Sequence, residues 1–225
     1  MNNYSVFIPA YNAERTIGAA ISSVLAQTVP CTEIVVVDDG STDKTVEIVA
    51  ACDGPIRLIC QENQGPGPAT NVGLKQAQCD VLTMLDSDDL WLPHKIEFQL
   101  AALNAHTHPT IVACMMRQFH HEKPDDENGQ VRQGIGRSGI IFRKKVFETV
   151  GPLVDPPGRV GEFVEWLGRA RSMGIRIETL PEVLALRRII PGSLTHKRPD
   201  LISKGFLSIA HQMMLNKRNG QIDDV

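Results

Sequence analysis

Two groups of carboxylates follow apolar runs in the first half of the chain, and their spacing suits metal binding. Asp38 and Asp39 follow EIVVV, and Asp86, Asp88 and Asp89 follow VLTML. Such runs predict buried strands, and open α/β sheets bind ligands outside the carboxyl ends of their strands. In extended backbone Asp86 and Asp88 would point to one side, where they could hold Mg²⁺ or Mn²⁺. The metal could in turn hold phosphate oxygens, so we expect a metal–diphosphate as the partner of these carboxylates.

Structural roles compete with this interpretation. An aspartate after a strand often caps a helix, and Asp89 could cap a helix over 94–105. The functional interpretation is favoured because both groups stand at strand ends of one sheet. Other nucleotide motifs fit less well, since the chain has no GxxxxGK[ST] loop. The stretch GPGPAT has Thr70 where a dinucleotide fingerprint has its third glycine, and its prolines remove backbone donors.

Strands and helices alternate regularly over the first half. The patterns predict strands in 4–10, 32–40, 55–60 and 80–86, and helices in 13–27, 41–52, 67–78 and 94–105. This alternation is typical of βαβ units. We therefore predict an α/β fold with a central, mainly parallel sheet flanked by helices.

The second half is less regular. We expect a strand at 110–117, a polar loop at 120–134 and a strand followed by a short helix in 138–151. A helix over 161–174 and one or two strands in 175–189 follow, and the tail from 199 to 217 has the pattern of an amphipathic helix. With neither repeats nor a linker, residues 1–225 are predicted to form a single domain.

Composition excludes several classes of function. The net charge of −3 argues against general nucleic-acid binding. No apolar run approaches the ~20 residues of a membrane-spanning helix, and the N-terminus lacks the pattern of a secretion signal. The five cysteines are scattered without a CxxC pair, which indicates free thiols rather than disulfides or structural zinc. We expect a cytoplasmic protein, with peripheral attachment to the inner face of the membrane as the alternative.

Four stretches resemble the family-2 glycosyltransferases of GT-A fold, in order from about residue 4 to residue 195. They are VFIPAYNAERTIGAAISSVLAQT, EIVVVDDGSTDKT, NQGPGPATNVGLKQAQCDVLTMLDSDDLW and GIIFRKKVFETVGPL. The resemblance implies transfer of a sugar, commonly from a UDP-sugar, to an acceptor hydroxyl with inversion, as in hexosyltransferases. It divides the chain into a nucleotide-sugar half (1–106), an acceptor half (107–198) and a helical tail (199–225).

The resemblance also assigns roles to individual residues. Asp39 would accept hydrogen bonds from the base, with Asp38 beside it. Asp86 and Asp88 match the DxD element, in which Asp88 would ligate Mn²⁺ or Mg²⁺ and Asp86 would touch ribose or metal. The rest of the implied nucleotide site is Pro9, Ala10, Tyr11, Asn71 and Ser87.

The general base is where this sequence departs from the family pattern. The family commonly has Glu-Asp at the start of a late helix, and here Phe163 stands in place of that aspartate. Glu162 is our candidate base, with Glu165 one helical turn further on as the reserve. The alternative is that both glutamates are solvent-exposed helix residues without a catalytic role.

Further departures motivate a second hypothesis. Thr70 replaces an arginine that the family often has near the nucleotide, and Ile190 replaces a histidine, with His196 further along. The alternative is therefore a catalytically degenerate, glycosyltransferase-like nucleotide-binding domain. A nucleotidyltransferase is a third hypothesis, but it needs a triphosphate loop rich in Gly, Arg and Lys. The stretch IPAYNAERTIGAA offers a single arginine.

The acceptor is open between a saccharide, a lipid-linked molecule and a protein. The polar loop 120–134 is our candidate for acceptor specificity, and its histidines, His120 and His121, are expected to be solvated rather than metal-bound. We expect Trp91 and Trp166 in the core. The apolar face of the tail could pack on the domain, form a homodimer or touch a membrane.

Overall fold

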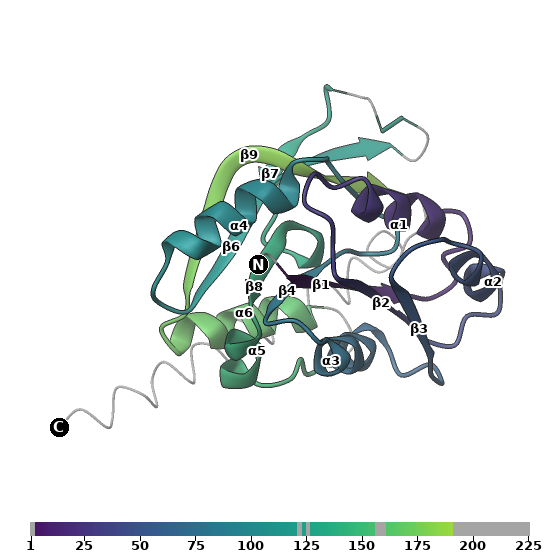
Figure 1. Ribbon diagram of the computed structural model, residues 1–225, viewed down its shortest axis with the longest axis horizontal. Coiled ribbons are helices and arrows are strands. Elements are labelled where there is room, and N and C mark those ends of the chain that lie inside the picture. The colour runs from purple at the N-terminus through teal and green to yellow at the C-terminus, as the bar shows by residue number, and fades with distance from the viewer. Residues whose placement is uncertain (1–2, 121–122, 125–126, 156–160, 191–225) are drawn as a thin grey trace.

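The computed structural model describes residues 3–120, 123–124, 127–155 and 161–190. Figure 1 shows helices on both faces of a central sheet. The predicted tail (199–225), His196 and His121 lie outside the described residues. The prediction of an α/β fold with a mainly parallel sheet is confirmed.

The first half supplies four parallel strands in the order β3-β2-β1-β4. They are β1 (Tyr4–Ala10), β2 (Glu33–Asp38), β3 (Ile56–Cys60) and β4 (Val81–Met84). The helices between them are α1 (Ile17–Leu25), α2 (Thr45–Ala50) and α3 (Pro66–Gln76). Each agrees with a predicted element, and proline at the first position of α3 is a favoured helix start.

The chain beyond β4 extends the same sheet, whose full order is β3-β2-β1-β4-β8-β6-β9-β5, with β7 paired to β6. The added strands are β5 (Leu90–Trp91), β6 (Thr110–His120), β7 (Val131–Gln133), β8 (Ile140–Arg143) and β9 (Arg176–Ile189). The added helices are α4 (Lys95–Ala105), the 3₁₀ turn η1 (Arg137–Gly139), α5 (Lys144–Val150) and α6 (Glu162–Ser172).

One expectation for this part needs correction. The region 120–134 is not loop throughout, because β7 pairs antiparallel with β6. Of the one or two strands expected in 175–189, the structure forms one, β9, and its pairing with β6 shifts register near Met115. Such an irregularity accommodates Pro181, which has no backbone N–H to donate to the neighbouring strand. Helix α6 ends as expected, with Gly174 at a positive φ of 76° just beyond it.

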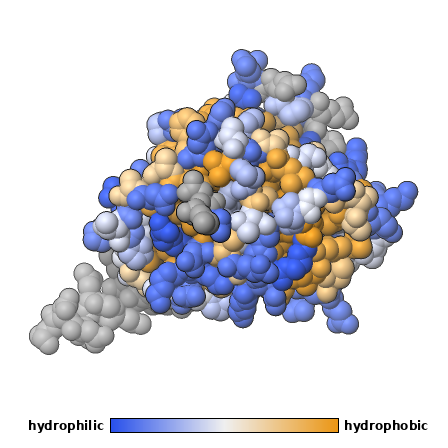
Figure 2. All heavy atoms as spheres, in the orientation of Figure 1, coloured by the Kyte–Doolittle hydropathy of each residue, from blue (hydrophilic) through white to orange (hydrophobic). Residues whose placement is uncertain are grey.

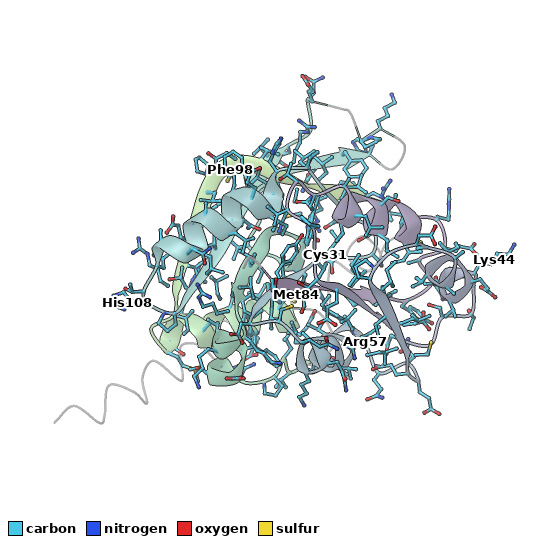
Figure 3. All side chains as sticks on the ribbon, viewed as in Figure 1. Cys31, Lys44, Arg57, Met84, Phe98 and His108 are labelled. Carbon is cyan, nitrogen blue, oxygen red and sulfur yellow. The ribbon has the colours of Figure 1, made fainter. Side chains whose placement is uncertain are left out.

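The sheet separates two apolar cores. Alternate residues of β1 point to opposite faces, so that Ile8 joins one core and Phe7 the other. Helices α1, α2 and α4 cover the first core, and α3, α5 and α6 cover the second. Met84, the last residue of β4, is fully buried and lies in the middle of the molecule in Figure 3. The acidic stretch that follows it therefore begins within the fold.

The surface is of mixed character. Figure 2 shows hydrophilic side chains around much of the outline and hydrophobic ones over the edge strand β3, which is half-buried. Among the described residues, no helix combines the length and apolarity that crossing a bilayer requires.

Close packing of α3 on β1 generates a stability prediction. A Cβ at Gly73 would lie 1.9 Å from the buried Phe7 ring, whereas one at Gly18 in α1 would meet its nearest atom at 3.6 Å. Glycine to alanine within a helix normally stabilises by about 1 kcal/mol. We expect Gly18→Ala to follow this rule. Gly73→Ala should instead lower the unfolding free energy by roughly 1–3 kcal/mol through overpacking. Urea denaturation of both variants checks this, and equal effects would contradict it.

Candidate functional site

The acidic groups flank the central strand β1. Ala10 at the end of β1 is in register with Asp38 at the end of β2, and Phe7 is in register with Met84 of β4. The chain leaves β1 to form β2 on one side and β4 on the other, so these carboxyl ends lie at a topological switch point. Crevices at such points bind ligands in open α/β sheets.

The loop after β1 is tied to the loop after β2. Asn12 has a positive φ of 47°, a conformation that asparagine tolerates better than most residues. Its backbone N–H donates to Ser41 Oγ, and its side-chain oxygen accepts from the Thr42 N–H, each at 2.8 Å. Tyr11 is left half exposed at the end of β1, beside Pro9 and Ala10.

Asp38 and Asp39 have different surroundings although both are buried. The Asp39 carboxylate accepts hydrogen bonds from the side chain of Gln61 (2.7 Å) and from the N–H groups of Gln64 (2.9 Å) and Gly65 (2.8 Å). Asp38 Oδ2 accepts from the Ser41 N–H, whereas its Oδ1 has no hydrogen-bond partner in the described part of the chain. Asp39 thus fixes the 61–65 loop, whereas Asp38 Oδ1 is an acceptor that these contacts leave unused.

Residues 86–89 form a turn, closed by a hydrogen bond from the Asp89 N–H to the Asp86 carbonyl. The extended backbone assumed in the sequence argument is therefore wrong here. Asp89 is buried, accepting from Ser138 Oγ (2.6 Å) and from the Arg188 N–H (2.9 Å). It stabilises the turn rather than capping α4, whose flanking residue His94 makes no side-chain cap.

The carboxylates of this turn repel one another. Burial and the charge of Asp86 raise the pKa of Asp88 to about 6. Burial and the charges of Asp88 and Asp86 raise the pKa of Asp89 well above its ordinary value. A divalent cation would relieve this repulsion. Within the described residues, no group of three or more His, Cys, Asp and Glu side chains could hold a metal alone. Two aspartates fit Mg²⁺ or Mn²⁺ when phosphates and water complete the shell.

One cation that the sequence argument missed lies at the centre of the site. Arg137, from η1, pairs with Glu162 Oε1, and its Nη1 lies 3.6 Å from Asp86 Oδ1. Burial lowers the pKa of this guanidinium, but Asp86, Glu162, Asp155 and Asp88 together raise it above its ordinary value. A lone arginine in the polar stretch GIGRSG gave no pattern from which to predict it.

The two candidate bases have different partners. The side chain of Glu162 is only 5% exposed and faces Arg137, and through it Asp86. Glu165 instead accepts from Arg169 Nε at 2.7 Å, while Arg169 also donates to the Val150 and Pro152 carbonyls. The structure thus brings Glu162 to the acidic turn and gives Glu165 a role in fastening α6.

Other predicted residues have structural contacts. Asn71 exchanges two 2.8 Å hydrogen bonds with the backbone of Leu153, so its amide holds the chain that leads toward α6. Ser87 is half-buried in the acidic turn. Trp91 and Trp166 are buried as expected, donating to the Ser138 and Gly151 carbonyls.

Comparison with known proteins decides the family. The profile described as "Glycosyl transferase family 2" matches residues 5–161. The chain belongs to this family. An uncharacterised glycosyltransferase of Nostoc sp. is 45% identical over 214 residues, which cover 82% of this chain and 64% of the relative. The Escherichia coli UDP-Glc:alpha-D-GlcNAc-diphosphoundecaprenol beta-1,3-glucosyltransferase is 41% identical over 107 residues, covering 46% and 42%.

Solved structures identify the fold. Residues 1–349 of S. aureus TarS, in complex with UDP-GlcNAc, match with a TM-score of 0.77 at 23% identity, over 95% of this chain and 67% of that TarS chain. The mannosyltransferase PcManGT from Pyrobaculum calidifontis, in complex with GDP-Man and Mn²⁺, matches with 0.75 at 21%, over 94% and 64%. These likenesses show the GT-A fold of this family-2 domain. The matched parts of this chain thus span 64% and 42% of the lengths of the two relatives above.

The buried pair of Arg137 and Glu162 should be strongly coupled. We expect Arg137→Met to lower the unfolding free energy by roughly 3–5 kcal/mol, because it leaves Glu162 buried without a cation. Adding Glu162→Gln should recover much of this loss. The more exposed i,i+4 pair of Glu165 and Arg169 is the control cycle, with an expected coupling of about 0.5 kcal/mol. Denaturant unfolding of both cycles measures the couplings, and additive effects at Arg137 and Glu162 would contradict the pairing.

Proposed function

We propose that this family-2 domain transfers a sugar from a nucleoside diphosphate sugar to an acceptor hydroxyl with inversion, assisted by a divalent metal. The observation that carries the proposal is the convergence of Asp86 and Glu162 on Arg137 beside the switch point of the sheet. It joins the proposed metal-binding carboxylates to a candidate base. A UDP-sugar is our proposed donor, supported by the UDP-Glc-dependent relative from E. coli.

On the donor side, Pro9, Ala10 and Tyr11 would line the nucleotide. Asp38 and Asp39 would lie at the base, where Asp38 Oδ1, a buried oxygen without a hydrogen-bond partner in the described residues, offers an acceptor to an N–H group of the base. Asp86 and Asp88 would hold Mn²⁺ or Mg²⁺, with Ser87 between them. The bound metal would neutralise the charge that develops on the departing nucleoside diphosphate.

On the acceptor side, Glu162 would take the proton of the attacking hydroxyl. The hydroxyl oxygen then bonds to the anomeric carbon from the face opposite the diphosphate. The bond from that carbon to the diphosphate oxygen breaks, and its electron pair leaves with the nucleotide. Arg137 holds Glu162 Oε1 and so orients the carboxylate for this transfer. A lipid-linked saccharide is the acceptor class suggested by the E. coli relative.

Nucleotide binding tests the donor site. Calorimetric titration of UDP, GDP, CDP and ADP, with and without Mn²⁺, should reveal one nucleotide whose binding depends on the metal. Asp88→Asn should weaken that binding by at least about tenfold, because it removes a charged ligand. Asp53→Asn, at an exposed aspartate, is the matched control and should bind as wild type does. If none of the four nucleotides binds wild type, the donor site is refuted.

Turnover tests the base. With the matching sugar nucleotide, we expect Glu162→Gln to reduce sugar transfer or donor hydrolysis by about 10²–10⁴-fold while the nucleotide still binds. Glu148→Gln, on the exposed face of α5, is the control. If Glu165→Gln carries the loss instead, Glu165 is the base. Nucleotide binding without any turnover would favour the degenerate nucleotide-binding domain, which the apolar Phe163 and the Arg137-bound Glu162 also fit.

A further inference from the structure

Three successive backbone carbonyls at the end of η1 are held by buried side chains from other elements. The Ser138 carbonyl accepts from Trp91 Nε1 at 2.8 Å. The Gly139 carbonyl accepts from Gln99 Nε2, and the Ile140 carbonyl from Thr83 Oγ1, each at 2.7 Å. These bonds leave the 138–140 backbone little freedom, because each partner is itself fixed in the core.

The same three side chains meet at one buried lysine. Lys95, the first residue of α4, is fully buried. Its Nζ donates to Gln99 Oε1 at 2.6 Å and to Thr83 Oγ1 at 3.4 Å, and it lies 4.1 Å from the centre of the Trp91 ring. The ammonium therefore orients all three groups that hold the carbonyls.

The segment held in this way carries the centre of the site. Arg137 precedes the held carbonyls and pairs with Glu162 and Asp86. Ser138 Oγ accepts from the Asp86 N–H at 3.1 Å and donates to Asp89 at 2.6 Å. A shift of the segment would move both residues relative to the acidic turn.

We infer that Lys95 is a positioning residue of the candidate site, acting from the core through three side chains on the segment 137–140. The inference deepens the proposed function and rests on it for its effect on binding. Its structural part, the ordering of 137–140 by Lys95, holds for the ligand-free chain.

Burial lowers the pKa of Lys95 to about 8, against a small opposing effect of Cys114 on β6. In the described part of the chain, Cys114 is the titratable group whose charge acts on it. The unfolded chain keeps this proton to about pH 10.4 and so binds more protons than the folded chain above pH 8. Stability due to Lys95 therefore rises between about pH 8 and pH 10, while the ammonium that orders the segment disappears.

These opposite trends define the experiment. Lys95→Met keeps the length of the side chain but removes the ammonium, and Lys145→Met, at an exposed lysine of α5, is the control. Hydrogen exchange of ligand-free protein at pH 7 should be faster in Lys95→Met across 137–142 and unchanged in the control. The affinity for the best-binding nucleoside diphosphate with Mg²⁺ should fall about tenfold at pH 7. This advantage of wild type should shrink by pH 9.5, because the charge of the ammonium is lost, while the stability of wild type relative to Lys95→Met rises.

Each other outcome overturns the inference. Unchanged exchange at 137–142 would mean that Lys95 does not order the segment. An affinity ratio that stays constant with pH would contradict the part that the charge of the ammonium plays in positioning the segment. If Lys95→Met does not fold, Thr83→Val, which removes the bond to the Ile140 carbonyl, must show the faster exchange and weaker binding instead. If wild type binds none of the nucleotides, the proposed function fails while hydrogen exchange still decides the role of Lys95.

Discussion

The repulsion among carboxylates around Arg137 is the constraint on which the site depends. Asp86, Asp88, Asp155 and Glu162 all act on its guanidinium. Buried carboxylates without a cation would take up protons, and protonated aspartates are poor ligands for a metal. Arg137 pairs with two of these carboxylates, and the charges of Arg188 and Arg187 on β9 oppose the rise in the pKa of Asp88. The pKa of Asp88 is raised even so, which makes a divalent ion, and a diphosphate bound to it, fitting partners of this cluster.

Sheet topology explains how residues so far apart in sequence reach one place. Asp86 follows β4, and β8, the antiparallel neighbour of β4, begins directly after η1. Pairing of β4 with β8 therefore sets Arg137 beside the acidic turn. Glu162 arrives separately, on a helix whose face packs under β8 through Phe142 and Trp166. The site is thus assembled at the seam between the parallel first half and the mixed second half of the sheet.

How much of this could be predicted from sequence follows from the range of the interactions. Strands β1, β2 and β4 are buried on both faces, so their apolar runs identified them and the carboxylates beyond them. Strand β7 is exposed and short, and only its pairing with β6 defines it. Arg137 and Asn71 have roles set by partners tens of residues away, which local patterns do not encode. The family resemblance was confirmed, while the roles that it assigns to single residues remain predictions.

The interior of the domain combines groups that an apolar core would exclude. Lys95 and Gln99 are fully buried, and burial disfavours the charged form of the lysine. Apolar residues of similar volume at these positions would be expected to stabilise the fold. They could not orient the donors that hold the 138–140 carbonyls, because those donors need polar partners of their own. Buried polar groups such as Lys95 and Gln99 lower the stability of the fold, but they fix the position of the 138–140 backbone under the charged site. The polar network in the core is therefore part of the site.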